Sequence, residues 1–475
     1  MIVLSFGFFL LLFVAVGVLS VMKRKSTSED YLLAGQNVKP WLVALSAIAT
    51  NNSGYMFVGQ IGFTYMYGLH SIWLMIGWVF GDFLTSLFVH KNLRIASEEN
   101  SSYSFAGTIA GWSGQDYKWL RILGGLITVA FLGTYAAAQL NAGSKALHVL
   151  FDWDYSTGAI MGAAMVLLYC FAGGIRASIW TDAAQSFVMI IAMALMLFVG
   201  VQSLGGISEF KDGLYGVSDA YMNLFPTDHP FGGFIGPFLF VLGWFFAGVG
   251  VVGQPHIMVR FMTMKSPESM TRTRIYYYSW YIAFYVMTIL VALSARLLIP
   301  DTEGFDAELA LPTLAQELLP DVFVGLILAG LFAATMSTAD SQILSCTSAI
   351  TQDLCPNKLS GYMATKLSTV FVTAVALCIA LFGSDSVFAL VLIAWSALAS
   401  AFAPLIIVYA LKQDVSEKLA ITMVFAGVGA MLAWRTAGLN DYCYEIAPGV
   451  LAGLLVFALG KVFALNTDKT STQQG

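Results

Sequence analysis

The segment Trp41-Leu-Val-Ala-Leu-Ser-Ala-Ile-Ala-Thr-Asn-Asn-Ser-Gly54 decides the fold, because an apolar run suitable for a membrane helix stops in its middle. Residues 50–54 either compete for backbone hydrogen bonds or lack a side chain, and therefore favour local unwinding. Unwound backbone within a bilayer survives only where it lines a cavity or is buried in protein. The segment therefore predicts a broken membrane helix beside a cavity.

A second apolar span is interrupted in a similar way, by Gly248, Gly250, Gly253, Gln254 and Pro255. Proline removes a helical N–H group and its ring opposes the carbonyl group four residues earlier. The two breaks fall in the first and sixth spans when counting begins after an extra N-terminal span. Corresponding interruptions in two halves of five spans indicate an inverted repeat with a substrate site near the midplane of the membrane.

Composition supports a membrane protein. Of 475 residues, 58% are hydrophobic and 11% are charged, against about 25% charged in soluble domains, and the mean hydropathy is +0.77. These values exclude a soluble globular enzyme. The net charge of -5 and the short basic run Lys23–Lys25 exclude a nucleic-acid partner. The five cysteines show no CxxC spacing, which argues against a disulfide framework or a metal cluster.

Hydropathy predicts an all-α integral membrane protein with about thirteen transmembrane helices. The predicted spans are 2–22, 39–67, 69–91, 118–150, 155–174, 178–203, 231–256, 272–298, 321–352, 361–384, 386–411, 417–436 and 443–465. We expect a single integral membrane domain over 1–475. Its parts are an extra N-terminal span (2–22), a first repeat (39–203), a second repeat (231–411) and two extra C-terminal spans (417–465).

Basic residues predict the orientation of these spans. If the N-terminus lies outside, 19 of the 23 Lys and Arg residues are cytoplasmic, which satisfies the positive-inside rule. The four exceptions are Lys145, Lys211, Arg296 and Arg435. We therefore expect a multi-pass protein of the cytoplasmic (inner) membrane with its C-terminus in the cytoplasm.

Three carboxylates fall at membrane depth, where an ionisable group is costly and is a functional candidate: Asp82, Asp182 and Asp340. Asp340 belongs to a stripe with Ser337, Thr338 and Ser341, on a span that also carries Ala334; spacings of three and four residues place the stripe on one helical face. Hydroxyl, carbonyl and carboxylate oxygens suit a hard cation such as sodium. The alternative is a stripe that only hydrogen-bonds neighbouring helices.

The roles of the other charged residues stay open at this point. Asp182 also fits a surface carboxylate or one paired with arginine, and Asp82 fits a structural or gating role as well as a functional one. We expect His256 and Arg260, which lie one turn apart after Pro255, to face water or lipid headgroups.

Four segments resemble the solute:sodium symporter family. They are the opening segment, Gly-Gly-Ile-Arg-Ala-Ser-Ile-Trp-Thr-Asp-Ala-Ala-Gln over 173–185, Gly-Gln-Pro-His-Ile-Met-Val-Arg-Phe-Met over 253–262, and Gly-Leu-Phe-Ala-Ala-Thr-Met-Ser-Thr-Ala-Asp-Ser-Gln over 330–342. The third is similar to the sodium/proline symporter branch. The resemblance covers nearly the whole chain and implies the 5+5 inverted-repeat fold of amino-acid symporters, with one extra N-terminal and two extra C-terminal helices.

The resemblance also implies ion sites. The main sodium site would use the carbonyl groups of Ala49, Asn52 and Ala334 and the hydroxyl groups of Ser337 and Thr338. Some members have a second sodium site, which maps here onto Asp182, Ser337, Asp340 and Ser341.

The implied function is a secondary-active symporter in which sodium drives import of a small organic solute, such as the amino acid proline. The backbone N–H groups of Ser53 and Gly54 suit a substrate carboxylate at a half-helix start. Further candidates for substrate contact are Asn51, Tyr135, Gln139, Trp244, Gln254 and Pro255.

Two departures from the proline branch concern the substrate. Asn51 stands where that branch commonly has aspartate, and Ala247 and Val251 stand where it has aromatic residues. The alternatives are a sodium- or proton-coupled carrier for a monocarboxylate, pantothenate or another osmolyte, and a membrane sensor that does not transport. We expect no enzyme activity, and sodium, the solute and the lipid bilayer as the partners, with no obligate protein partner.

Overall fold

The computed structural model describes residues 1–151, 153–300, 302–383 and 387–463. Within these ranges the regular structure is helical, apart from an isolated bridge between Val38 and Met264. Residues 384, 386 and 464–465, which end or begin predicted spans, lie outside the described residues.

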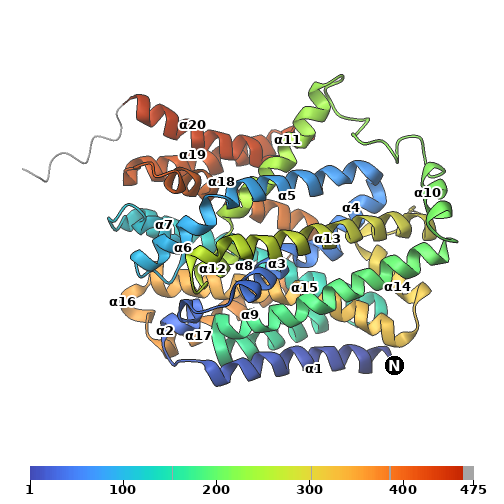
Figure 1. Ribbon diagram of the computed structural model, residues 1–475, viewed down its shortest axis with the longest axis horizontal. Helices are drawn as coiled ribbons and strands as arrows, with labels where there is room; N and C mark the ends of the chain where they lie inside the picture. Colours follow the sequence, from blue (N-terminus) through green and yellow to red (C-terminus); the bar gives the residue numbers. More distant parts are fainter. Residues whose placement is uncertain (152, 301, 384–386, 464–475) are drawn as a thin grey trace, which may run out of the picture.

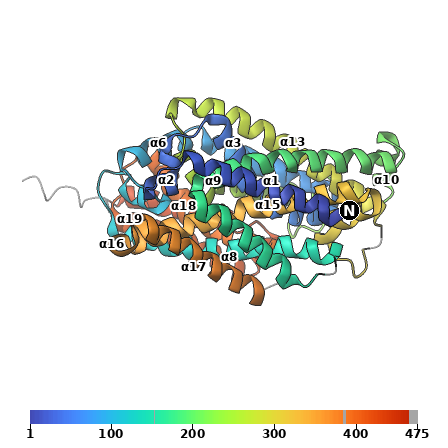
Figure 2. The ribbon, with the colours of Figure 1, turned by 90° about the horizontal axis from the view of Figure 1, so that it is seen from below.

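Most helices run along the long axis of the molecule (Figure 1, Figure 2). The longer ones, together with the shorter α4 and α12, are α1 (Ile2–Ser20), α3 (Pro40–Phe57), α4 (Gly59–Tyr67), α5 (Ile72–Ser86), α8 (Lys118–Phe151), α9 (Tyr155–Ser203), α11 (Ile235–Val249), α12 (Pro255–Met262), α13 (Met270–Leu298), α15 (Asp321–Ser348), α17 (Tyr362–Phe382), α18 (Val387–Ala410), α19 (Glu417–Thr436) and α20 (Ile446–Val462). Short helices connect them: α2 (Ser28–Leu33), α6 (Val89–Glu99), α7 (Phe105–Gly111), α10 (Ile207–Tyr215), α14 (Ala310–Leu318) and α16 (Pro356–Leu359).

The number of spans differs from the prediction when each helix is judged by length and composition. Nine helices in the described residues qualify, or ten if one bent pair is a single span. The difference has visible causes. Helix α9 joins two predicted spans across a kink at Gly174, where φ is 58°, and α20 has only 17 residues. The total of thirteen spans stays a prediction.

Helix α15 forms the centre of the bundle. It packs against α9, α8, α3 and α1, and 89% of its span is buried, against 22% for α1. Helices α1 and α20 lie at opposite edges of the bundle (Figure 1). A polar stripe on α15 therefore faces other helices rather than lipid, while the helices of the two chain ends are peripheral. The boundaries of the two repeats stay a prediction.

Helices α5 and α11 approach closely through glycines. A Cβ atom on Gly248 would lie 2.1 Å from the carbonyl oxygen of Trp78, and one on Gly81 would lie 2.2 Å from that of Phe245. Small residues permit such backbone contact in membrane bundles, where packing rather than hydrophobicity holds helices together. The contact brings Trp78 beside Trp244, with ring centroids 6.3 Å apart, just before the second break.

Candidate ion and substrate site

The first break is confined to one residue. The prediction of unwinding over 50–54 is too broad, since only Ser53 is non-helical within α3, with φ 50° and ψ 179°. Polar side chains accept hydrogen bonds from the backbone N–H groups that follow this non-helical residue. Gly54 N–H donates to Oε1 of Gln139 at 2.8 Å, and Tyr55 N–H donates to Oγ of Ser53 at 3.1 Å. The N–H group of Gly54, which we expected to be free for a carboxylate, is thus capped by Gln139.

The second break is longer. Residues Gly250–Gly253 form a 3-10 turn, Gln254 is extended (φ -96°, ψ 103°), and Pro255 begins α12. Nε2 of Gln254 donates to the carbonyl oxygen of Trp395 at 3.0 Å, and the indole N–H of Trp395 donates to that of Ala247 at 3.2 Å. Trp395 of α18 is therefore hydrogen-bonded to residues on both sides of the second break.

Tyr135 of α8 lies between the two breaks. Its hydroxyl group contacts Oγ of Ser53 at 3.4 Å, and its ring meets the edge of the His256 ring with centroids 5.5 Å apart. Helix α12 also packs directly against α3. The structure therefore brings Ser53, Tyr135 and the start of α12 together, as expected for substrate candidates.

Several polar atoms around the breaks are buried without a hydrogen bond among the described residues. They are Oδ1 of Asn51, both side-chain polar atoms of Asn52, Nε2 of Gln139, Oε1 of Gln254 and both ring nitrogens of His256. Most buried polar groups in proteins have a partner, and an unmet group costs about 1–3 kcal/mol. A cluster of such groups between two helix breaks is therefore suited to a polar ligand. Nδ2 of Asn51 does have a partner, the hydroxyl oxygen of Tyr277 at 2.6 Å.

Trp244 lies on the other side of this region, at the end of a cavity of about 510 Å³. The cavity opens between α4, α11 and the segment around Tyr442 and Tyr444, and Trp244 packs on Tyr444 with ring centroids 5.1 Å apart. Trp78 packs against both Tyr55 and Trp395. Through Trp78, aromatic contacts connect the cavity lining at Trp244 to Tyr55, near the first break, and to Trp395, beside the second.

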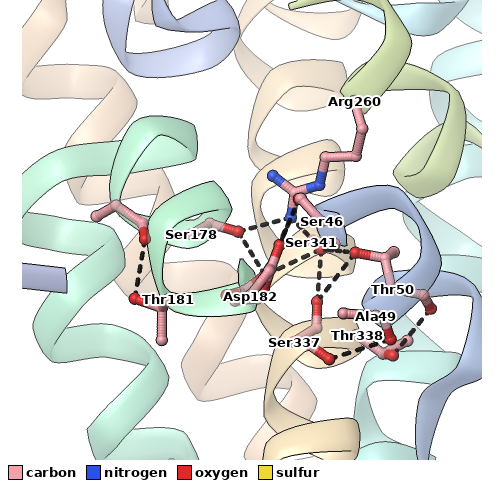
Figure 3. A network of polar contacts seen from close by, with 12 residues as sticks. Ser46, Ala49, Thr50, Ser178, Thr181, Asp182, Arg260, Ser337, Thr338 and Ser341 are labelled. Atoms are coloured by element: carbon pink, nitrogen blue, oxygen red, sulfur yellow. Dashed lines mark hydrogen bonds and ion pairs between the residues drawn. The ribbon is translucent and has the colours of Figure 1, made fainter. Parts of the chain in front are cut away.

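A group of uncharged oxygens lies where α3 meets α15, one turn before the first break, and we call it the oxygen cluster. The hydroxyl group of Ser337 donates to the carbonyl oxygens of Ala49 (3.2 Å) and Ala334 (3.1 Å). The hydroxyl group of Thr338 donates to those of Thr50 (2.9 Å) and Ala334 (3.1 Å). All five residues are buried, and Figure 3 shows Ser337 and Thr338 turned toward Ala49 and Thr50.

The oxygen cluster contains four of the five residues that the resemblance implied for the main sodium site. Among the described residues, the side-chain hydrogen bonds of Ser337 and Thr338 reach Thr50 rather than the fifth, Asn52. Carbonyl and hydroxyl oxygens are the ligands of hard cations. The arrangement therefore gathers oxygens of the type that a sodium ion prefers.

Beside the oxygen cluster lie two carboxylates and a guanidinium group, which we call the triad: Asp182, Arg260 and Asp340. Nη2 of Arg260 is 3.3 Å from Oδ2 of Asp182 and 3.2 Å from Oδ1 of Asp340, and all three side chains are 0% exposed. Asp340 also accepts hydrogen bonds from Tyr169 at 2.8 Å and Ser178 at 2.7 Å, and Asp182 accepts one from Ser46 at 2.6 Å. Breaking a buried pair of this kind typically costs about 3–5 kcal/mol.

The expectation that His256 and Arg260 face water or headgroups is wrong, since both are completely buried. Helix α12 packs on α3 and α15, which turns Arg260 inward to the carboxylates (Figure 3). The arginine partner of Asp182 is thus Arg260 and not the nearby Arg176, which pairs with Asp30. The sequence does contain a signal for this contact. Two carboxylates at membrane depth are costly unless a positive charge pairs with them, and Arg260 is an arginine that can do so.

Two hydroxyl groups join the oxygen cluster to the triad. Oγ of Ser341 lies 2.9 Å from Oδ1 of Asp340, 2.9 Å from Oγ1 of Thr50, and donates to the carbonyl oxygen of Ser337 at 2.6 Å. The remaining carboxylate, Asp82, is buried on α5, and neither of its oxygens accepts a hydrogen bond among the described residues. No three His, Cys, Asp or Glu side chains in the described ranges gather into a metal site.

Comparisons with known proteins identify relatives over most of the chain. A model described as "Sodium:solute symporter family" matches residues 31–465. The high-affinity proline transporter PutP of Bacillus subtilis is 28% identical over 91% of this chain and 92% of its own length. A sodium/proline symporter of Staphylococcus aureus is 28% identical over 94% of this chain and 90% of its own length.

Solved structures share the fold. A Na+-coupled sialic acid symporter, reported in a substrate-bound outward-open state with a novel Na+ site, has a TM-score of 0.84 at 18% identity and covers 97% of both chains. MhsT in complex with L-phenylalanine has a TM-score of 0.59 at 13% identity over 89% of this chain and 98% of its own. At these identities the likeness establishes the fold alone.

Proposed function

The chain belongs to the sodium:solute symporter family, whose members are secondary transporters rather than enzymes, and on this premise we propose that it imports an amino acid, with proline as the first candidate. The support for proline is that two relatives, which match over at least nine tenths of their length, are proline transporters. The oxygen cluster is the observation that carries the proposal, because it offers sodium a site at the first helix break.

The proposed main sodium site is made of Ala49, Asn52, Ala334, Ser337 and Thr338, with the Thr50 carbonyl group as a further ligand. The hydroxyl–carbonyl contacts of 2.9–3.2 Å support it, since rotation of the two hydroxyl groups would turn their hydrogens away and leave oxygen lone pairs facing a sodium ion beside the carbonyl oxygens. A second cation position lies among Asp182, Ser337, Asp340 and Ser341, and the guanidinium group of Arg260 already occupies part of it.

The proposed substrate site lies between the two breaks. Unpartnered polar atoms of Asn51, Gln139, Gln254 and His256 can meet the ammonium and carboxylate groups of an amino acid. The carboxylate would approach the N–H groups at Ser53 and Gly54, where a half-helix begins, by displacing Oε1 of Gln139 from Gly54. Tyr135, Pro255 and Trp244 complete the boundary of the site.

Sodium and solute favour each other's binding in this arrangement. Sodium fixes α3 next to the break at Ser53, and a solute that binds the ordered break strengthens sodium binding by the same coupling free energy. We place the N-terminus outside the cytoplasmic membrane and the C-terminus inside. The membrane potential then adds about 2.3 kcal/mol per inward charge per 100 mV.

Uptake by proteoliposomes tests the proposal. Labelled proline, other amino acids, a monocarboxylate and pantothenate are each supplied with an inward gradient of sodium, lithium or potassium. We expect uptake of proline with sodium and only the level of empty liposomes with potassium. Equal uptake in sodium and potassium contradicts sodium coupling. Sodium-driven uptake of pantothenate or a monocarboxylate alone contradicts the amino-acid assignment, and binding of a solute without uptake identifies a sensor.

A further inference from the structure

A cavity of about 420 Å³ lies where α3 begins, and none of its lining residues belongs to the proposed ion or substrate site. We call it the basic cavity, because the described residues that line it include Lys39, Arg176 and Lys265 but no carboxylate. Trp41 and Trp180 complete the part of the lining that matters here. Lys39 precedes α3, Lys265 follows α12 and Arg176 belongs to α9, so only the packing of these helices gathers the three cations.

A backbone bridge holds the two lysines close together. The N–H group of Val38 donates to the carbonyl oxygen of Thr263 at 3.1 Å, and the N–H group of Lys265 donates to that of Val38 at 3.1 Å. The bridge between Val38 and Met264 is parallel, so Lys39 and Lys265 directly follow it on the two paired segments. Both ammonium groups therefore belong to one cavity.

The charges of the basic cavity are not balanced by the protein. Lys39 and Lys265 are exposed, and within the described part of the chain neither forms an ion pair. Arg176 is paired with Asp30 and donates to the carbonyl oxygen of Ala34 at 2.7 Å, while its Nε has no hydrogen bond among the described residues. Two positive charges held together without a counter-charge attract an anion.

The surroundings of the basic cavity favour a lipid as the source of that anion. Trp41 is 43% exposed, and tryptophan is enriched where a membrane meets water. Trp180 begins a stripe on α9 that continues through the exposed Phe187, Ile191 and Phe198, at spacings of seven and four residues that keep one helical face. An acyl chain can lie along this stripe while its headgroup enters the basic cavity.

We propose that the basic cavity binds the headgroup phosphate of an anionic phospholipid such as phosphatidylglycerol. Lys39 and Lys265 contact the phosphate, and basic pockets between membrane helices are typical sites for such headgroups. Because one lysine precedes α3 and the other follows α12, the bound phosphate ties together the ends of two helices that carry or adjoin the breaks. Binding of this lipid is independent of which ion or solute the chain transports.

Native mass spectrometry of the purified full-length chain tests the proposal. The chain is supplied with equal amounts of phosphatidylglycerol and phosphatidylcholine that have the same acyl chains. We expect the parent to retain phosphatidylglycerol in preference. Lys39→Gln/Lys265→Gln should bind it about thirtyfold more weakly, whereas Lys39→Arg/Lys265→Arg keeps both charges and the preference. Equal retention of the two lipids by the parent, or unchanged affinity in the glutamine variant, overturns the proposal.

Lys91→Gln/Lys358→Gln is the matched control. It removes the same number of charges from exposed lysines that do not line the basic cavity, and affinity for phosphatidylglycerol should stay within about twofold of the parent. A loss as large as that of Lys39→Gln/Lys265→Gln would mean that the lipid responds to the general positive charge of the surface, which overturns a defined site.

Thermal unfolding in detergent separates a lipid from a soluble anion. We expect long-chain phosphatidylglycerol to raise the unfolding temperature of the parent, because it binds the folded chain. A short-chain phosphatidylglycerol should raise it less, and inorganic phosphate should leave it unchanged, since neither covers the stripe on α9. A rise with inorganic phosphate as large as the rise with the long-chain lipid overturns the lipid in favour of a soluble anion.

Discussion

The oxygen cluster and the triad meet on the central helix α15, where Asp340 follows Ser337 and Thr338, but they differ in the kind of group that each offers a cation. The oxygen cluster presents neutral carbonyl and hydroxyl oxygens from α3 and α15. The triad presents two full negative charges and already holds an arginine. The difference teaches that a neutral group and a charged group of oxygens can lie side by side on one helix, and that only the charged group is already paired with a cation of the protein.

The largest effect is expected from removing the hydroxyl ligands of the oxygen cluster. In the double variant Ser337→Ala/Thr338→Ala, sodium loses two ligands, each worth about 1.5 kcal/mol when the partner is charged. We expect the half-saturating sodium concentration for uptake to rise about a hundredfold. Sodium dependence of solute uptake into proteoliposomes is the measurement.

Ser345→Ala is the control for that variant. It removes another buried hydroxyl group of α15, one without a hydrogen bond among the described residues, and should leave the half-saturating concentration unchanged. If the double variant behaves like this control, the stripe on α15 only packs helices together.

Removal of sodium is expected to weaken the folded protein by an intermediate amount. Sodium at ten times its dissociation constant stabilises the native state by about 1.4 kcal/mol, because only the folded chain assembles the oxygen cluster. Thermal unfolding in detergent, with sodium exchanged for potassium at constant ionic strength, measures this shift. The Ser337→Ala/Thr338→Ala variant should show no difference between the two salts, and a difference of the parent's size in that variant would place the stabilising ion elsewhere.

Thr50→Val tests the connection between the oxygen cluster and the triad. The substitution keeps the β-branched shape and the carbonyl group of residue 50, but it removes the hydroxyl group 2.9 Å from Ser341. We expect about a threefold rise in the half-saturating sodium concentration, because the variant loses one neutral hydrogen bond, the one between residues 50 and 341. Sodium titration of uptake measures it, with Thr347→Val, further along α15, as control. A hundredfold rise would mean that the hydroxyl group itself ligates sodium.

The smallest effect on sodium is expected at Ser46 of α3, whose hydroxyl group contacts the triad. Ser46→Ala removes the hydrogen bond to Asp182 and leaves the oxygen cluster and the charges in place. The free energy of unfolding should fall by about 1 kcal/mol, while sodium affinity stays within about twofold of the parent. Thermal unfolding and sodium binding are both measured. A larger loss of affinity would show that Asp182 ligates the ion directly.

Much of the fold was predictable because it depends on local pattern. Apolar runs of helical length place the spans, and α19 begins and ends at the predicted residues, 417 and 436. Both breaks were also predicted, since Asn51, Asn52 and Pro255 oppose a continuous helix wherever they lie. The extent of a break was less predictable. Side-chain caps from Gln139 and Ser53 confine the first one to a single residue, and Gln139 is remote in sequence.

The sequence by itself determined which residues can serve a hard cation, because ligand type and helical spacing are local properties of Ala334, Ser337 and Thr338. Only the tertiary structure decided what surrounds them. The packing of α12 on α3 and α15 carries Arg260 inward to Asp182 and Asp340, residues 78 and 80 positions away. The physical reason is that an arginine near a helix end can face either water or the protein interior. Helix packing decides between the two, because only neighbouring helices supply the counter-charges.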